Sequence, residues 1–232
     1  MVGQRKHAQK SAKSSGRAEA KAVPVAKVEA KTNLKSVHAR QIIAILIIVF
    51  SGLALIASVI LTADLIHVLR NPNVSLSCNI NPVLSCQSVM KTWQADLLFG
   101  MPNSLIGVAA FAVTLTFGVL ILMNVKLPRW MWIGLWLGVL GGLAFAGWML
   151  DQSLYVIGTL CPFCLIVDFS TVMIFGALSQ HIFRNNLMEL SVKTNAKITK
   201  FVQMDGVKVV VVALIVLAFL LIYARFGNAL FS

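Results

Sequence analysis

The chain has 232 residues, of which 58% are hydrophobic and 12% charged, and its net charge is +12. A soluble domain has about 25% charged residues, so this composition excludes a chain that buries its apolar residues in one water-soluble core. Ten of the 20 Lys and Arg residues lie within 1–40, without any aromatic residue for base stacking, which argues against nucleic-acid binding. The composition therefore predicts a membrane protein, and the apolar runs described below predict that it is all-α, with five transmembrane helices.

Residues 1–40 form a basic segment rich in Ala, Lys, Ser and Val. Such a segment cannot bury enough apolar surface to fold, so we expect a disordered tail. The basic region is too long for a secretory signal peptide, and no small-residue cleavage site follows the first apolar run. A solvated cytoplasmic tail is the expected role, and contact with anionic lipid headgroups or RNA is an alternative.

Five apolar runs are long enough to be transmembrane helices, because about 20 helical residues cross the hydrocarbon core of a bilayer. The predicted spans are 41–65, 104–124, 130–150, 162–183 and 207–226. We expect the first four to form one bundle within 41–183. A cytoplasmic loop at 184–206 would then connect this bundle to the fifth transmembrane helix.

The segment 66–103 differs from the spans, since it contains Asn-Pro turns and two cysteines. Helical spacing from Ser85 to Leu98 places Val89, Trp93 and Leu97 on one face, which predicts a short helix at the membrane surface. Where the first span meets this segment lie Asp64 and His67, and interfacial anchoring is their expected role, with proton relay as the alternative.

Two patterns mark the third span. Gly134 and Gly138 have the small-x-x-x-small spacing that lets helix backbones approach one another. Trp130 and Trp132 begin this span, and we expect them to belong to an aromatic belt at the membrane surface.

The basic residues set the expected orientation. If the N-terminus is cytoplasmic, 17 Lys and Arg residues fall on the inside and three, Arg70, Lys91 and Arg225, on the outside. The positive-inside rule therefore predicts a multi-pass protein of the cell's inner (cytoplasmic) membrane, with a cytoplasmic N-terminus and an external C-terminus.

This orientation places all four cysteines at the outer face, where disulfides persist: Cys78, Cys86, Cys161 and Cys164. The C-x-x-C motif, Cys161-Pro162-Phe163-Cys164, opens the fourth span. The positive end of a helix stabilises a thiolate, so the motif favours a reactive pair. Structural disulfides and a four-cysteine zinc site are the alternatives to a redox relay.

Around these cysteines the chain resembles the bacterial form of the vitamin K epoxide reductase family. The resemblance covers about 40–183 and rests on four segments: Cys78-x7-Cys86, Ser85-Cys86-Gln87-Ser88-Val89, Phe99-Gly100-Met101-Pro102-Asn103-Ser104 and Cys161-Pro162-Phe163-Cys164. It implies a four-helix bundle around a quinone, with a fifth helix in some members. It also implies a membrane thiol oxidase that supports disulfide formation in exported proteins.

The resemblance further implies an electron path. A reduced thioredoxin-like protein gives electrons to Cys78, Cys86 exchanges with Cys161, and Cys164 reduces the quinone, which is menaquinone or ubiquinone. Because about six residues follow the fifth span, we expect the thioredoxin-like partner to be a separate protein.

Asn103 and Asp168 are the other candidate site residues. By the resemblance, Asn103 binds a quinone carbonyl, although it could also be the N-cap of the second span. Asp168 lies four residues after Cys164 on the same helix face, and an acid within a span is a candidate functional group. It could donate a proton to the quinone, or pair with polar groups of neighbouring spans.

Two alternative functions stay open. A second family of quinone-coupled thiol oxidases, related to bacterial disulfide-bond protein B, carries its C-x-x-C in the first outer loop, whereas here the order is reversed. A non-catalytic membrane protein, such as a transporter subunit, would hold purely structural disulfides.

Overall fold

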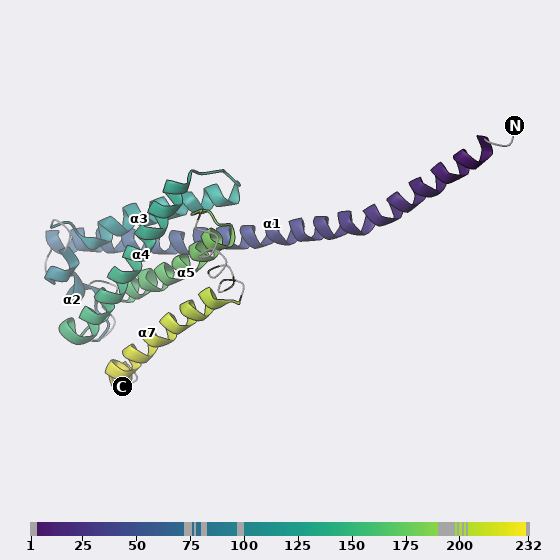
Figure 1. The fold of residues 1–232 in the computed structure, drawn as a ribbon. Coiled ribbons are helices and arrows are strands. Elements are labelled where there is room, and N and C mark those ends of the chain that lie inside the picture. Colours follow the sequence, from purple (N-terminus) through teal and green to yellow (C-terminus); the bar gives the residue numbers. More distant parts are fainter. Residues whose placement is uncertain are drawn as a thin grey trace. The chain divides into compact units, whose positions relative to one another are not determined.

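A computed structural model of the chain describes residues 4–71, 76, 78–79, 83–96, 100–189, 198, 200, 202 and 204–230, with side chains from Val37 to Gly227. The chain divides into two units, Met1–Ile42 and Ile43–Ser232. Figure 1 shows the helices, which are, in chain order, α1 (Gln4–Arg70), α2 (Cys86–Met90), η1 (Trp93–Asp96), α3 (Asn103–Leu122), α4 (Arg129–Gln152), η2 (Ser153–Ile157), α5 (Pro162–Arg184) and α7 (Gly206–Leu230).

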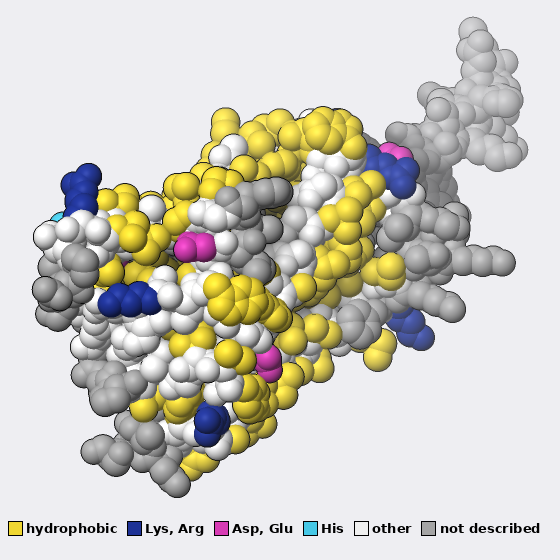
Figure 2. Space-filling model, turned by 90° about the vertical axis from the view of Figure 1, so that its left-hand side faces the viewer, with side chains coloured by type: hydrophobic (Ala, Val, Ile, Leu, Met, Phe, Trp, Pro, Cys, Tyr) yellow, Lys and Arg dark blue, Asp and Glu magenta, His cyan; other side chains and the backbone are white. Residues whose placement is uncertain are grey.

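Five of these helices are long and apolar enough to cross a membrane. Their spans are Val37–Arg70, Asn103–Leu122, Arg129–Ile157, Pro162–Arg184 and Gly206–Gly227. No more than 39% of the most apolar window of any span is buried, so most of each span is left for lipid or partners. Figure 2 shows hydrophobic side chains over much of the visible surface, with few charged ones between them. The predicted all-α membrane fold is confirmed.

In the first unit, the backbone is helical from Gln4 onward. The sequence predicts a disordered tail over 1–40, and this assignment stays a prediction. Ala, Lys and Glu are strong helix formers, and this segment is rich in the first two, which explains a helical backbone where the apolar content is low. The cytoplasmic location of this tail stays a prediction.

The core of the second unit lies where α1, α4 and α5 meet. Ile47, Leu178 and Ile182 are fully buried there. Trp132 joins them with 4% of its surface exposed, and its ring centroid lies 5.4 Å from that of His181. The prediction that Trp132 belongs to an interfacial belt is therefore wrong, because its ring has apolar partners on neighbouring helices. Trp130 is 71% exposed, as a belt residue would be.

The close helix contacts do not involve the predicted glycines. A Cβ added at Gly134 or Gly138 would meet no atom within 4 Å, so neither glycine brings two backbones together. One close approach is between α1 and α3, where a Cβ at Gly118 would lie 2.9 Å from Ile48 Cγ1, and another is between α5 and α7, where a Cβ at Gly176 would meet Val211. Gly107 makes a similar contact with Ser58. The glycines of α4 instead border a cavity that is described below.

The predicted surface helix over Ser85–Leu98 is two short helices. The Thr92 hydroxyl donates to the carbonyl of Val89 (2.7 Å), which satisfies an acceptor at the end of α2 and lets the chain turn before η1. Val89 is buried, but Trp93 is 66% exposed, so the two do not share one docked face. Leu97 lies outside the described residues.

Candidate functional site

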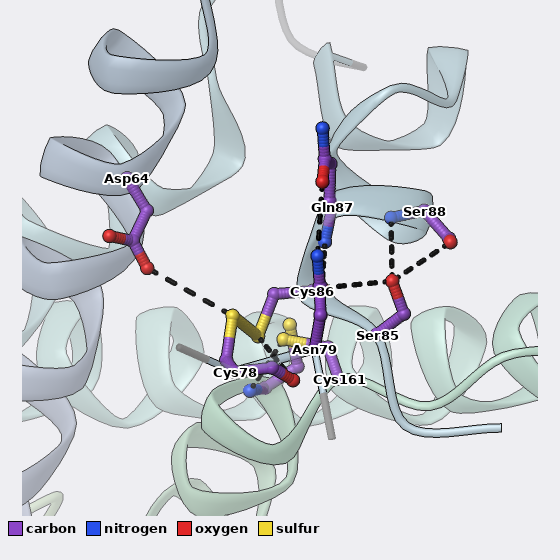
Figure 3. Close-up of a disulfide and its surroundings, with 9 residues drawn as sticks. Asp64, Cys78, Asn79, Ser85, Cys86, Gln87, Ser88 and Cys161 are labelled. Carbon is purple, nitrogen blue, oxygen red and sulfur yellow. Dashed lines mark hydrogen bonds between the residues drawn. A yellow bond between two sulfur atoms is a disulfide. The ribbon is translucent and has the colours of Figure 1, made fainter. Parts of the chain in front are cut away.

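Cys78 and Cys86 form a disulfide, with their Cα atoms 5.8 Å apart. Both side chains are buried, at 4% and 0% exposed. Cys86 is the first residue of α2, and Cys78 precedes it by eight positions in the loop (Figure 3).

Short polar side chains hold this loop in place. The Ser85 hydroxyl caps α2 by accepting from the Ser88 N–H (3.2 Å) and donates to Asn79 Oδ1 (3.0 Å). Asn79 also binds Gln87 twice, accepting from its N–H (3.3 Å) and donating to its Oε1 (3.0 Å). Figure 3 shows this network beside the disulfide. The sequence around Cys86 therefore fixes the loop through local hydrogen bonds.

Asp64 of α1 lies on the other side of the disulfide. Its Oδ2 is 4.0 Å from Cys78 Sγ (Figure 3). A disulfide sulfur carries no hydrogen, so this is a contact in the oxidised pair and becomes a possible hydrogen bond when Cys78 is a thiol. In the sequence Asp64 marks the end of the first span, and nothing near it there indicates this contact.

Cys161 and Cys164 are free thiols at the start of α5. Cys161 is the N-cap, Pro162 occupies the first turn, and the Cys164 N–H donates to Cys161 Sγ at 3.3 Å. The side-chain hydrogen bond from Cys164 lowers the pKa of Cys161, as do the N–H groups of Cys164 and Phe163, against burial, which raises it. The predicted placement of C-x-x-C at a helix N-terminus is confirmed.

A two-residue bridge connects the two cysteine pairs. Leu84 pairs with Leu160 in parallel: the Ser85 N–H donates to the Leu160 carbonyl (2.9 Å), and the Leu160 N–H donates to the Val83 carbonyl (2.8 Å). Because Ser85 and Leu160 directly precede Cys86 and Cys161, these bonds set the two cysteines side by side.

All four cysteines meet in one hydrophobic cluster. Cys78, Cys86 and Cys161 are its buried members, and Cys164 packs against it. Figure 3 shows Cys161 next to the disulfide. The structure therefore brings together residues that lie more than 70 positions apart in the sequence.

A large apolar cavity of about 1030 Å³ begins at this cluster. Residues of α1, α3, α4 and α5 line it, together with Cys86, Val89 and Met90 from the loop. Cys161 and Cys164 lie on its wall, and Gly134, Gly138, Gly141 and Gly142 widen it along α4. Cavities of about 300–1,000 Å³ are typical of small-molecule sites, so this cavity is large enough for one.

Asn103 lies on the cavity wall at the first position of α3. The N-cap is Pro102, so the alternative interpretation of Asn103 as an N-cap is wrong. Its side-chain amide donates to the Gln94 carbonyl (2.5 Å), and its Oδ1 is buried without a hydrogen-bond partner among the residues that the structure describes. Gln94, which sequence analysis did not identify, is 2% exposed and donates to Gln152 Oε1 (3.4 Å).

Asp168 also lies on the cavity wall, one helical turn beyond Cys164. It makes no hydrogen bond or ion pair with any residue that the structure describes, which argues against the alternative of pairing with a neighbouring span. Its carboxyl group is therefore available to a molecule in the cavity. Among the described residues no group of three or more His, Cys, Asp or Glu side chains could hold a metal ion, so the zinc alternative has no support there.

The sequence model of the vitamin K epoxide reductase family matches residues 45–178, which is more than half of the chain. The chain belongs to the vitamin K epoxide reductase family. Comparison with curated proteins gives no match. Membership makes this multi-pass membrane protein an oxidoreductase of a family that acts on quinones.

The cavity of this family member fits a quinone. Its wall is mostly apolar, as an aromatic ring and an isoprenoid chain require. Polar groups interrupt it near the cysteine cluster, among them the Cys164 thiol, the Asp168 carboxyl and the Oδ1 of Asn103, which no described residue binds. A quinol hydroxyl could donate to this Oδ1, and the second hydrogen of the Asn103 amide could bind a quinone carbonyl.

Proposed function

We propose that the protein is a membrane thiol oxidase. It passes electrons from a reduced thioredoxin-like protein through Cys78/Cys86 and then Cys161/Cys164 to a quinone, either menaquinone or ubiquinone. This activity would support disulfide formation in exported proteins. The observation that carries the proposal is one buried cluster that contains a disulfide and two free thiols, at the end of an apolar cavity.

The first exchange takes place at the loop pair. A thiolate of the partner attacks Cys78 Sγ, and Cys86 leaves as a thiolate with the electron pair of the broken bond. The second thiol of the partner then releases Cys78, so the partner leaves oxidised and the loop pair is reduced. Asp64 beside Cys78 is placed to accept a hydrogen bond from the Cys78 thiol that results.

The second exchange transfers the electrons to the C-x-x-C pair. The Cys86 thiolate attacks Cys161 Sγ of an oxidised Cys161–Cys164 pair, and Cys164 leaves as a thiolate. Cys78 then attacks Cys86, which re-forms the loop disulfide and releases Cys161. The arrangement in the structure, a Cys78–Cys86 disulfide with free Cys161 and Cys164, matches the state that follows this step.

The third exchange takes place at the cavity. A bound quinone supplies an acceptor for two electrons and two protons. Asn103 would orient it, and the carboxyl group of Asp168 would hold and transfer a proton. The Cys161 and Cys164 thiols would together give up two electrons and two protons and form the Cys161–Cys164 disulfide, with Cys164 nearest to the acceptor. The apolar wall would exclude water from the reacting groups.

We propose the orientation that the basic residues predict: an N-terminus in the cytoplasm and both cysteine pairs on the outer side of the inner membrane. A reporter enzyme that is active only in the cytoplasm, fused after Ser232, is expected to be silent. Activity of this reporter would contradict the proposed orientation.

Alkylation of the cysteines in membranes tests the proposed function. After mild reduction, adding a quinone should protect Cys161 and Cys164 from a thiol-specific reagent, and then Cys78 and Cys86. The Cys164→Ser variant should lose this quinone-dependent protection. Disulfides that form equally with and without quinone would support purely structural disulfides instead.

A further inference from the structure

Helix α7 contacts the site through the π-helix η2, which ends shortly before the C-x-x-C pair. Gly158, with φ +74°, ends η2 in a left-handed conformation. Carbonyl groups in the last turn of a helix have no partner within that helix. Here the Leu154 carbonyl accepts a hydrogen bond from Arg225 Nε of α7 at 3.2 Å.

Apolar contacts strengthen this connection. Leu154, Leu160 and Phe226 are buried at 0%, 1% and 7% exposure and form one cluster. Partly buried residues from α7, α4 and the cysteine loop pack against it: Leu221, Ile222, Leu150, Val83 and Leu84. The Arg225 guanidinium lies 5.9 Å from the Phe226 ring centroid, so the hydrogen bond and the apolar cluster are adjacent.

The same cluster contains the bridge between the two cysteine pairs. Val83 and Leu84 come shortly before Cys86 in the chain, and Leu160, with which Leu84 pairs, comes directly before Cys161. A shift of η2 would therefore move Leu160 and change the position of Cys161 relative to Cys86. A thiolate reacts with a disulfide only at contact, with Cα atoms about 4.4–6.8 Å apart in the product, so small shifts here affect exchange.

We propose that Arg225 is a positioning residue for the exchange between Cys86 and Cys161, and that α7 controls the rate of this step. The inference rests on the proposed function. In the step, a Cys86–Cys161 bond forms, the Cys161–Cys164 bond breaks and Cys164 takes the electron pair. Arg225 touches none of these atoms. It acts by fixing the Leu154 carbonyl, hence η2 and Leu160.

The alternative to a positioning role is that Arg225 only anchors a positive charge at the membrane surface. Lysine would serve that role equally well, because it keeps the charge. Lysine lacks the N–H at the ε position that binds Leu154, however. The two roles therefore predict different behaviour for Arg225→Lys.

The experiment uses the full chain in membranes, in a Cys78→Ser/Cys164→Ser background that keeps Cys86 and Cys161 for cross-linking. The formation of their disulfide is followed over time after adding a mild oxidant, per amount of protein in the membrane. Arg225→Gln should slow it about fivefold, the effect of one lost hydrogen bond. Arg225→Lys should also slow it.

Lys208→Gln is the matched control, since Lys208 pairs with Asp205 (2.8 Å) near the start of α7, and it should leave the rate unchanged.

A second measurement separates positioning from folding. In the chain with all four cysteines, Arg225→Gln should lower kcat with a thioredoxin-like donor and leave its KM unchanged, because the donor meets Cys78. The melting temperature in detergent should equal that of Lys208→Gln.

Equal cross-linking rates in Arg225→Gln and the background would overturn the inference and leave the proposed function intact. Equal slowing in Lys208→Gln, or normal exchange in Arg225→Lys, would also overturn it. A background that never forms the Cys86–Cys161 disulfide would overturn the proposed relay itself.

Discussion

The two cysteine pairs are held by different kinds of structure. Cys78 and Cys86 belong to a loop that is fixed by a few polar side chains and continues into the five-residue helix α2. Cys161 and Cys164 begin α5, which has 23 residues and packs on both α4 and α7. Moving the loop pair would cost a few hydrogen bonds and the burial of its apolar contacts, whereas moving the second pair would displace a transmembrane helix.

This difference matches two tasks. In the structure the loop disulfide is buried, so a protein partner reaches Cys78 only if the loop shifts. The C-x-x-C pair instead lies on the wall of a cavity whose shape must be kept for a small molecule. Under the proposed function, the loop pair meets the protein partner and the C-x-x-C pair meets the quinone in the cavity.

The largest expected effect comes from the cavity pair. Cys161→Ser and Cys164→Ser should each abolish quinone reduction, even when a small dithiol replaces the protein donor, because the cavity then has no dithiol on its wall. The measurement is the loss of quinone absorbance in detergent or proteoliposomes. Normal oxidation of a small dithiol by the Cys164→Ser variant would show that the two pairs are assigned wrongly.

The loop pair should give a donor-dependent effect. Cys78→Ser and Cys86→Ser should abolish turnover with a thioredoxin-like donor but keep part of the turnover with a small dithiol, which reaches the second pair directly. Comparing the two donors in the same assay checks this. Equal loss of turnover with both donors would show that the two cysteine pairs do not have different donors.

A smaller effect is expected from Asp168, which belongs to the cavity side of the comparison. Asp168→Asn removes the carboxyl group that faces the cavity and should lower kcat about a hundredfold, at the lower end of the range for general acid–base catalysis, with the donor KM unchanged. Asp151→Asn, an exposed acid on α4, is the control. If both variants behave alike, Asp168 has no special role in the cavity.

The sequence predicts the spans well because long apolar runs have few alternative interpretations. The C-x-x-C pair at the start of α5 was also predicted, since Pro162 and the onset of apolar residues mark a helix N-terminus. These features depend on residues that are close in the chain.

Features that depend on distant residues were not predicted. The Leu84–Leu160 bridge joins two loops by two hydrogen bonds, and neither sequence segment looks like a strand. Trp132 is buried because its partners, among them Phe117 and His181, come from other helices. Gly134 and Gly138 of α4 border a cavity instead of a helix, and α3 approaches α1 through its own glycines.

The account depends on direct exchange between the two pairs, and the Cys78→Ser/Cys164→Ser variant tests it most directly. Without Cys164, no neighbouring thiol can attack Cys161 and break a Cys86–Cys161 disulfide. Without Cys78, no neighbouring thiol can attack Cys86 and break it. After oxidation in membranes, peptide mapping should show a cross-link between the peptide with Cys86 and the peptide with Cys161 in most of the protein. Both cysteines remaining open to alkylation after thorough oxidation would mean that the pairs do not exchange, and would contradict the relay.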